Sequence, residues 1–313
     1  MLFLLTNDDG IDAPGLAAQH EALSGFLAEP PWRDGKATEP VEIVVVAPDR
    51  GRSECGHSVT TGRELYLREV RPGWFSLDGT PVDCVRVALT TICPRAAAVF
   101  SGINAGANVG VDLLVSGTFA AAREAALLGR PAMAISHYRR PDVVKTWEHT
   151  GRWLRPVFAQ FFEQFPTRLR SDATTEQPTE GCFGPAHGPL WNVNLPAIEP
   201  TGCPPEVVYC PVEKRPLIRR SKWMSRHLRW QKADGEGGAV ELSGEKAPSI
   251  LARSDAEEQT VTSDSTQLPQ GDLREGHVAM TSNFHDRPRS EGTDVDRCFS
   301  GGLTVSVLQP HLF

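Results

Sequence analysis

The chain has 313 residues, of which 40% are hydrophobic and 23% are charged, and its formal net charge is −7 at pH 7. These proportions are ordinary for a soluble globular protein with a large core. The negative charge argues against a protein whose main partner is a nucleic-acid backbone. The apolar run at residues 1–5 is too short for a signal peptide, and no run is long enough to span a bilayer. We therefore expect a cytoplasmic protein with no membrane partner.

Seven cysteines, an odd number, lie at scattered spacings along the chain. No pair has the C-x-x-C spacing of a zinc or redox motif. They are interpreted as reduced thiols, which suits a cytosolic protein.

The hydrophobic pattern predicts strands that alternate with helices. The run at 42–47 is rich in β-branched residues on both faces, which is typical of a parallel strand covered by helices on each side. The pattern therefore predicts an α/β fold with a mostly parallel sheet. The expected strands are 2–5, 42–47, 64–68, 73–77, 96–100, 131–136, 190–196, 207–209 and 276–282. The expected helices are 14–27, 81–89, 116–129 and 142–165, with Asp12, Thr80 or Asp83, and Ser116 or Thr118 as capping residues of the first three.

Two adjacent carboxylates, Asp8 and Asp9, follow the first predicted strand and precede Gly10. In an open α/β sheet, ligands bind at the edge where the strands have their carboxyl ends. Two carboxylates there repel each other and are costly to desolvate unless a cation lies between them or a proton is shared. Hard cations such as Mg²⁺ prefer oxygen ligands of this kind. The alternative is a solvated turn, because Asp-Gly is a common turn pair.

The loops that follow the next two central strands are expected to lie at the same edge of the sheet. In the polar loop 48–58, Ser53 offers a hydroxyl oxygen to a metal, and Arg50 or Arg52 offers a guanidinium to a phosphate. An ordinary solvated loop is the alternative there. The segment 101–110 contains three glycines and two asparagines, which suits a backbone that wraps closely around a ligand.

The tripeptide Ser116-Gly117-Thr118 opens an alanine-rich predicted helix. The first turn of a helix presents free backbone N–H groups, and these hydroxyls add to them, so the position suits an anion. Simple N-capping by Ser116 or Thr118 is the alternative, and it is compatible with anion binding.

In combination these motifs resemble the SurE (survival protein E) family of metal-dependent 5'/3'-nucleotidases. Four blocks carry the resemblance, in order: 6–10 with 13–15, 46–50 through 52–53, 79–85, and 101–106 with Asn108, Gly110 and 116–118. A weaker match is 192–196, and the segment 276–282 resembles the family's final core strand. The loop 53–58 departs from the family pattern with Glu54 and His57, and the region 200–275 departs in length and in sequence.

The resemblance implies a Rossmann-like three-layer fold and one Mg²⁺ or Mn²⁺ per subunit. It assigns the metal to Asp8, Asp9, Ser53 and Asn104, with Asp8 and Asp9 as the catalytic residues. It assigns the phosphate to Asn108, Ser116, Gly117 and Thr118. The implied activity is hydrolysis of nucleoside 5'-monophosphates, and also of 3'-monophosphates, by attack of a metal-activated water.

Three regions are expected along the chain. Residues 1–200 would form the catalytic core, 201–275 an insertion or projecting oligomerisation arm, and 276–313 a return to the core and a C-terminal tail. Within the arm, the basic and aromatic segment 219–232 suits contact with RNA or acidic partners. An oligomer contact is the favoured interpretation, because the acidic segment 234–258 offsets that charge. We therefore expect a homodimer or homotetramer without a nucleic-acid partner.

Two alternative functions remain open from the sequence. A metal-dependent deacetylase on a similar sheet would need histidine ligands, and only His57 lies in a predicted edge loop. A nucleotide-binding protein without catalysis would bind nucleoside phosphates and release no phosphate with any divalent cation.

Overall fold

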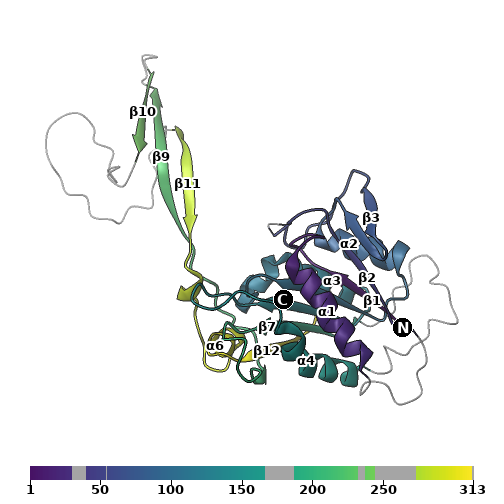
Figure 1. Ribbon diagram of the computed structural model, residues 1–313. Helices are drawn as coiled ribbons and strands as arrows, with labels where there is room; N and C mark the ends of the chain where they lie inside the picture. Colours follow the sequence, from purple (N-terminus) through teal and green to yellow (C-terminus); the bar gives the residue numbers. More distant parts are fainter. Residues whose placement is uncertain (30–39, 54, 166–186, 232–236, 244–272, 312–313) are drawn as a thin grey trace. The chain divides into compact units, whose positions relative to one another are not determined.

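The computed structural model describes residues 1–29, 40–53, 55–165, 187–231, 237–243 and 273–311 (Figure 1). Most of the polar loop expected at 167–189 therefore lies outside the described residues. The chain divides into two compact units. Unit 1 comprises Met1–Pro216 and Pro288–Phe313, and unit 2 comprises Leu217–Arg287.

Unit 1 is built on a mixed sheet, which has nine strands within the described residues in the order β3-β4-β2-β1-β5-β6-β7-β12-β8. From β4 to β7 all neighbouring strands are parallel, whereas β3 is antiparallel to β4 and β12 is antiparallel to β7. This confirms the predicted α/β fold with a mostly parallel sheet. The strands are β1 (Leu2–Thr6), β2 (Glu42–Pro48), β3 (Leu67–Arg71), β4 (Trp74–Leu77), β5 (Ala98–Asn104), β6 (Ala132–His137), β7 (Leu190–Leu195), β8 (Val207–Tyr209) and β12 (Leu303–Leu308).

Helices cover both faces of this sheet and give it three layers (Figure 1). Adjacent residues of β1 show why, since Phe3 packs with the aromatic face of α4 and Leu4 packs with α2 and α3 in a second buried cluster. Side chains alternate between the faces of a strand, so an unbroken apolar run needs cover on both sides. The helices are α1 (Pro14–Ala28) and α4 (Thr150–Gln164) on one face, and α2 (Pro81–Val87) and α3 (Gly117–Leu127) on the other. The shorter helical segments of unit 1 are η1 (Ala88–Ile92), η2 (Gly110–Val115) and α6 (Asp294–Phe299).

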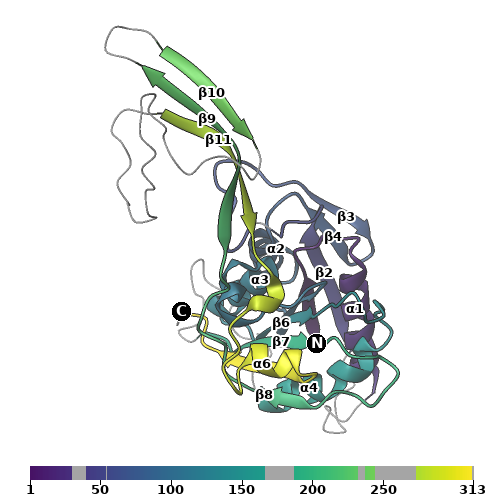
Figure 2. The same cartoon turned by 90° about the vertical axis from the view of Figure 1, so that its left-hand side faces the viewer.

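Unit 2 contains a three-stranded antiparallel sheet in the order β10-β9-β11 (Figure 2). Its elements are β9 (Arg220–Gln231), β10 (Gly237–Ser243), β11 (Leu273–Thr281) and η3 (Phe284–Asp286). Residues 220–231 of the predicted basic segment 219–232 therefore form the central strand of this sheet, and residue 232 lies outside the described residues. Side chains of residues 222–276 lie outside the description, so the expected aromatic contacts of that segment stay predictions.

Three predictions about individual elements are wrong. The segment 276–282 is not the last strand of the core, because β11 pairs with β9 in unit 2 and the final core strand is β12. The helix predicted from Asp142 begins at Thr150, since Arg139 donates from Nη1 to the Thr146 carbonyl at 3.0 Å and holds the preceding residues in a loop. Asp12 does not cap α1: Ala13 occupies the cap position without a side-chain hydrogen bond.

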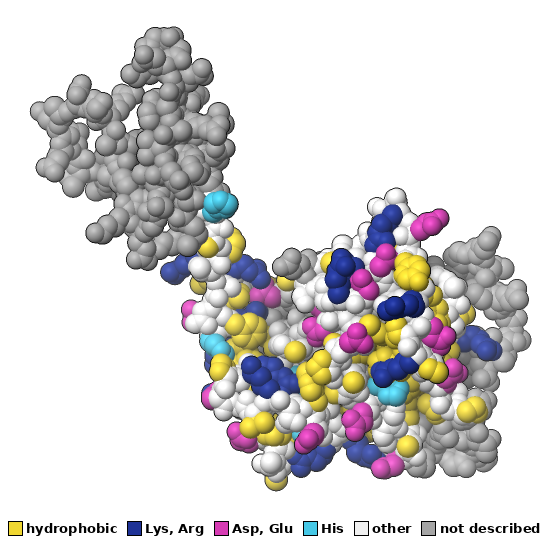
Figure 3. All heavy atoms as spheres, turned by 45° about the horizontal axis from the view of Figure 1, so that its top comes forward, with side chains coloured by type: hydrophobic (Ala, Val, Ile, Leu, Met, Phe, Trp, Pro, Cys, Tyr) yellow, Lys and Arg dark blue, Asp and Glu magenta, His cyan; other side chains and the backbone are white. Residues whose placement is uncertain are grey.

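The surface of unit 1 carries both signs of charge. On the face drawn in Figure 3, Lys and Arg side chains are interspersed with Asp and Glu side chains. The cysteines within the described residues are free thiols, as expected, and Cys182 lies outside them. Among the described residues, no helix combines the length and the apolar character that a membrane span requires.

Candidate active site at the carboxyl edge of the sheet

The turn after β1 is shaped by its own side chains. Asn7 accepts at Oδ1 from the Gly10 N–H (3.2 Å) and donates from Nδ2 to the Gly10 carbonyl (2.9 Å). Gly10 has φ +104°, and a Cβ there would lie 3.0 Å from the backbone carbon of Arg50. The turn therefore needs glycine both for its conformation and for the close approach of the loop after β2. It presents Asp8, which is buried, and Asp9, which is half-buried, at the end of β1.

Asp8 lies at the N-terminus of α3. The Thr118 hydroxyl donates to Asp8 Oδ1, and the Thr118 N–H also interacts with this carboxylate. Burial raises the pKa of Asp8 to about 6, the Thr118 hydroxyl opposes that rise, and the neighbouring Asp9 adds to it. Burial also raises the pKa of Asp9, against the effect of the Ala105 N–H. Asp8 and Asp9 thus form a carboxylate pair whose negative charge is poorly compensated by the protein.

Gly117 is in contact with Asp8. A Cβ built at Gly117 would lie 2.8 Å from Asp8 Cβ and 2.9 Å from Asp8 Oδ2. The nearest neighbours of Gly117 are therefore atoms of the Asp8 side chain, a candidate metal ligand, and a larger side chain here would press on Asp8 first. Ser116 caps α3 by accepting the Phe119 N–H at 3.1 Å, which confirms one of the predicted caps. The Thr118 hydroxyl thus donates within the protein, whereas the Ser116 hydroxyl accepts a hydrogen bond and keeps its proton for a further partner.

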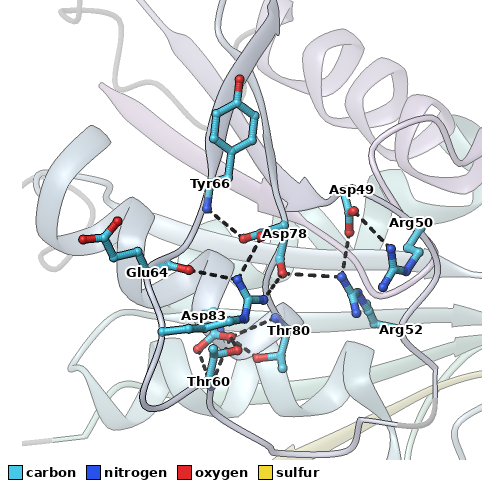
Figure 4. A network of polar contacts seen from close by, with 10 residues as sticks. Asp49, Arg50, Arg52, Thr60, Glu64, Tyr66, Asp78, Thr80 and Asp83 are labelled. Carbon is cyan, nitrogen blue, oxygen red and sulfur yellow. Dashed lines mark hydrogen bonds and ion pairs between the residues drawn. The ribbon is translucent and has the colours of Figure 1, made fainter.

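The loop after β2 is attached to this turn by backbone contacts. The Arg52 N–H donates to the Asp8 carbonyl at 2.7 Å. Figure 4 shows the side chain of Arg52, whose Nη2 donates to Asp49 Oδ1 at 2.8 Å. Ser53 follows directly and is exposed to solvent. Arg50 is also exposed and lies 3.6 Å from Asp49 Oδ2. The predicted ligand Ser53 is therefore one residue from a backbone contact with the carboxylate turn.

The far end of the same loop is fixed on α2. The Asp83 carboxylate accepts from the Thr60 hydroxyl (2.6 Å) and the Thr80 N–H (2.9 Å) (Figure 4). In turn, the Thr80 hydroxyl oxygen accepts the Asp83 N–H at 3.1 Å, and the same hydroxyl donates to the Ser58 carbonyl at 2.8 Å. The sequence predicted Thr80 or Asp83 as the cap of this helix, and the structure shows that both act, in a reciprocal capping box. It orders residues 58–60, which follow the loop with Ser53.

His57 fixes the middle of the loop on α3. Arg123 Nε donates to His57 Nδ1 at 3.0 Å, so His57 Nε2 carries the proton and donates to Glu124 Oε2 at 2.9 Å. Arg86 Nε donates to the other oxygen of Glu124 at 2.6 Å. Burial raises the pKa of Glu124, but the hydrogen bonds from His57 and Arg86 outweigh it and leave that pKa below its usual range. His57 therefore has a positioning role in this structure and its ring nitrogens are both occupied.

Asn104 ends β5 at the same edge of the sheet. Asn104 Nδ2 donates to the Gly106 carbonyl at 2.7 Å, and this local hydrogen bond fixes the orientation of the side-chain amide, including its oxygen Oδ1. The next residue, Ala105, is close enough to Asp9 for its N–H to affect the carboxyl pKa. The ends of β1 and β5 are therefore adjacent, as the parallel pairing of Thr6 with Ser101 requires.

Two asparagines of β7 hold the glycine-rich loop. Asn194 accepts the Asn108 N–H at Oδ1 and donates from Nδ2 to the Asn108 carbonyl, both at 2.9 Å. Asn192 Nδ2 donates to the same carbonyl at 2.9 Å, and Asn108 Nδ2 donates to Ser136 Oγ at 2.8 Å. The motif at 192–196, weakest of the sequence matches, thus positions the loop that contains Asn108.

A pair of buried histidines lies at the end of β6, with His137 as the last residue of the strand. His137 Nδ1 donates to the Tyr138 carbonyl at 2.8 Å, so its Nε2 accepts from His149 Nε2 at 2.7 Å. Burial chiefly, with repulsion from Arg139, lowers the pKa of His137 to about 3 and that of His149 to about 4. Both rings are therefore neutral at pH 7 and form a structural contact.

Comparison with known proteins decides the family. The family model described as "Survival protein SurE" matches residues 3–217. The chain belongs to the SurE family. It is 32% identical over 309 residues to a protein of Synechocystis sp., covering 99% of this chain and 100% of the relative. It is 36% identical over 216 residues to the "5'-nucleotidase SurE" of Pelobacter propionicus, covering 69% of this chain and 72% of the relative.

The solved structures agree on the fold. The crystal structure of the SurE protein from Aquifex aeolicus matches with a TM-score of 0.62 and 23% sequence identity, covering 100% of this chain and 95% of that chain. The architecture of this SurE-family chain is thus shared with a solved member.

The candidate donors at this edge suit a hard divalent cation. Among the residues described, no three His, Cys, Asp or Glu side chains converge on one point. A metal in this SurE-family chain would therefore be held by Asp8 and Asp9 together with neutral oxygens such as those of Ser53 and Asn104. The fit rests on the buried, poorly compensated Asp8. All of these donors are oxygens, which Mg²⁺ and Mn²⁺ prefer to nitrogen or sulfur.

Sequence reasoning missed several residues that shape the site. Glu124, Arg123 and Asn194 contact loop residues far away in the sequence, so no local pattern identifies them. Two signals were available: the unexpected His57 in the loop, and the alternation of Asn192 and Asn194 on a buried strand.

Proposed function

We propose that this chain is a divalent-metal-dependent nucleotidase that hydrolyses nucleoside 5'-monophosphates, and also 3'-monophosphates, to nucleoside and phosphate. The supporting observation is the buried Asp8 beside Asp9 at the carboxyl edge of a parallel sheet, a pair that needs a cation to offset its charge. The names of the relatives support the same reaction. The homologue from Pelobacter propionicus is a 5'-nucleotidase.

Asp8 and Asp9 would hold one Mg²⁺ or Mn²⁺ per subunit, with Ser53 and Asn104 as the neutral ligands. When bound, such a cation lowers the pKa of a water molecule and neutralises phosphoryl oxygens. The protein's own contribution is orientation. Thr118 holds one oxygen of Asp8 in place, and the Arg52 N–H fixes the backbone of Asp8 against the loop that carries Ser53.

We assign the phosphate to Ser116, Gly117 and Thr118, with Asn108 as a further contact. The support is the contact of Gly117 and Thr118 with Asp8, which places this turn beside the candidate metal site. The macrodipole of α3 gives its N-terminus about half a positive charge, which favours both the Asp8 carboxylate and a phosphate. Because Asp8 already accepts the Thr118 hydroxyl, the Gly117 N–H and the Ser116 hydroxyl proton would be the donors from this turn.

The alternative of a deacetylase with histidine ligands has less support. Both ring nitrogens of His57 are hydrogen-bonded, to Arg123 and Glu124. A binding protein without catalysis is the remaining alternative, and it makes a different experimental prediction.

The test is phosphate release from a panel of nucleoside 5'- and 3'-monophosphates with Mn²⁺, with Mg²⁺ and with a chelator. We expect release that requires the cation and that Asp9→Asn abolishes. The matched control is Asp12→Asn, which changes an exposed carboxylate outside the site. Nucleotide binding without phosphate release under any cation would favour the binding protein, and release that persists in the chelator would refute the metal assignment.

A further inference from the structure

Asp294 is a completely buried carboxylate far in sequence from the candidate ligands. Its Oδ2 accepts the N–H of Gly110 at 2.8 Å, and its Oδ1 accepts the N–H groups of Glu213 and Val295, each at 2.8 Å. A carboxylate with three backbone donors is held firmly and holds them in return. One side chain thus joins three segments of unit 1: the glycine-rich loop, residues 211–213 and the start of α6.

The Gly110 contact lies at a critical point of the candidate site. Gly110 has φ +63° and begins η2, which leads directly to Ser116 and the first turn of α3. The same loop begins at Asn104, and its middle is held on β7 by the two backbone contacts between Asn108 and Asn194. The segment between the candidate ligand Asn104 and the candidate phosphate turn is therefore fixed at two points, by β7 and by Asp294.

The other contacts of Asp294 lie where the chain leaves unit 1 for unit 2 and returns from it. The Asp294 N–H donates to the Pro211 carbonyl at 2.9 Å, and Glu213 Oε2 accepts the Ser290 N–H at 2.6 Å. Arg215 Nη2 donates to Ser290 Oγ at 2.8 Å. The outgoing segment 211–215 and the returning segment 290–294 are thus bonded to each other, and Asp294 connects both of them to Gly110.

We propose that Asp294 is a positioning residue for the nucleotidase reaction, which holds the loop 104–116 in its active conformation from the start of α6 in unit 1. This inference rests on the proposed function. It assigns to the C-terminal segment, in which sequence reasoning placed no site residue, a direct role in ordering the candidate catalytic loop. Through Asp294, the segments 211–215 and 290–294, which precede and follow unit 2 in the chain, are also linked to that loop.

The experiment compares Asp294→Asn with Glu213→Gln. The first variant replaces one acceptor oxygen by an NH₂ group, which cannot accept the hydrogen bonds that this oxygen makes. The second weakens the contact between the outgoing and returning segments but leaves Gly110 bound to Asp294. In Asp294→Asn we expect kcat/KM at saturating Mn²⁺ to fall about tenfold. We expect faster amide hydrogen exchange of 104–116 in Asp294→Asn. In Glu213→Gln we expect both readouts within about twofold of wild type, even if its Tm falls.

Two results would overturn the proposal: unchanged exchange of 104–116 in Asp294→Asn, or an equal loss of kcat/KM in the two variants. If Asp294→Asn fails to fold, the Gly110 amide of the wild-type protein decides. A slow exchange of that amide, comparable to β5, is expected, and a fast exchange contradicts the contact. Absence of phosphate release by the wild type would instead refute the proposed function, and the exchange measurements distinguish the two failures.

Discussion

Replacing Gly117 by alanine should damage the candidate metal site through a single methyl group. The added Cβ would lie 2.8 Å from Asp8 Cβ and 2.9 Å from Asp8 Oδ2. Carbon atoms in ordinary contact are about 3.5 Å apart, so Asp8 and α3 must separate by roughly 0.7 Å. Gly117 does not have a positive φ, so the effect is steric and not conformational. The movement would also strain the hydrogen bond between Thr118 and Asp8.

Overpacking of this kind costs about 1–3 kcal/mol. If the cost falls on the metal-binding conformation of Asp8, Mn²⁺ affinity should fall about 5- to 150-fold. Because Asp8 is a candidate catalytic residue, kcat should also fall. We do not expect metal binding to remain intact in such a variant, since the new atom contacts the ligand itself.

The assay is Mn²⁺ titration by calorimetry, with steady-state kinetics on a nucleoside monophosphate and thermal unfolding in parallel. Gly25→Ala is the matched control, because Gly25 lies within α1 and a Cβ there meets nothing within 4 Å. That control should gain about 0.5–1 kcal/mol of stability and keep its metal affinity. Wild-type affinity and kcat in Gly117→Ala would refute the reasoning.

Three further predictions concern charge and assembly. Asp8→Asn should abolish activity and raise the Tm of the metal-free protein at pH 7. Burial raises the pKa of Asp8 to about 6, above its unfolded value of about 4. The stability that the protonated carboxyl contributes is therefore fully present below pH 4 and is lost as the pH rises through 6. A Tm at pH 7 that is unchanged relative to the Asp12→Asn control would contradict this. Burial lowers the pKa of His137 to about 3 and that of His149 to about 4, so both are neutral when folded, and stability should be lost as the pH falls below the unfolded pKa of about 6.5. His149→Gln should make the loss of Tm between pH 7 and pH 5 smaller, and an identical slope would count against it. We also propose a homodimer or homotetramer assembled through unit 2. Residues 217–287 can be replaced by a short Gly-Ser linker, because the segments that flank them, 211–215 and 290–294, are hydrogen-bonded to each other. This replacement should reduce the mass measured by light scattering to that of a monomer. A monomeric intact chain would refute the proposal.

The central strands were predictable because their sequence signal is local. β1, β2, β5, β6 and β7 are apolar or alternating runs. The structure shifts the boundaries of four of them by one residue at most, whereas β5 begins two residues later and ends four residues later than predicted. The start of α2 was equally predictable, with Thr80 or Asp83 as its cap, since Thr80, Pro81 and Asp83 stand at fixed spacing. By contrast, the partner of β11 was not, because a strand pattern does not specify which edge it pairs with.

The sequence by itself determined the α/β sheet, the succession of its central elements along the chain, and the position of Asp8, Asp9, Ser53 and Asn104 at or after the ends of strands that end at one edge. Parallel strands impose that common edge, so local patterns suffice. Only the tertiary structure decided which groups surround these residues. Thr118 lies 110 residues from Asp8, and Asp294 lies 184 residues from Gly110. Such contacts depend on how helices and loops pack over the sheet, and packing depends on the whole chain and leaves no local sequence pattern.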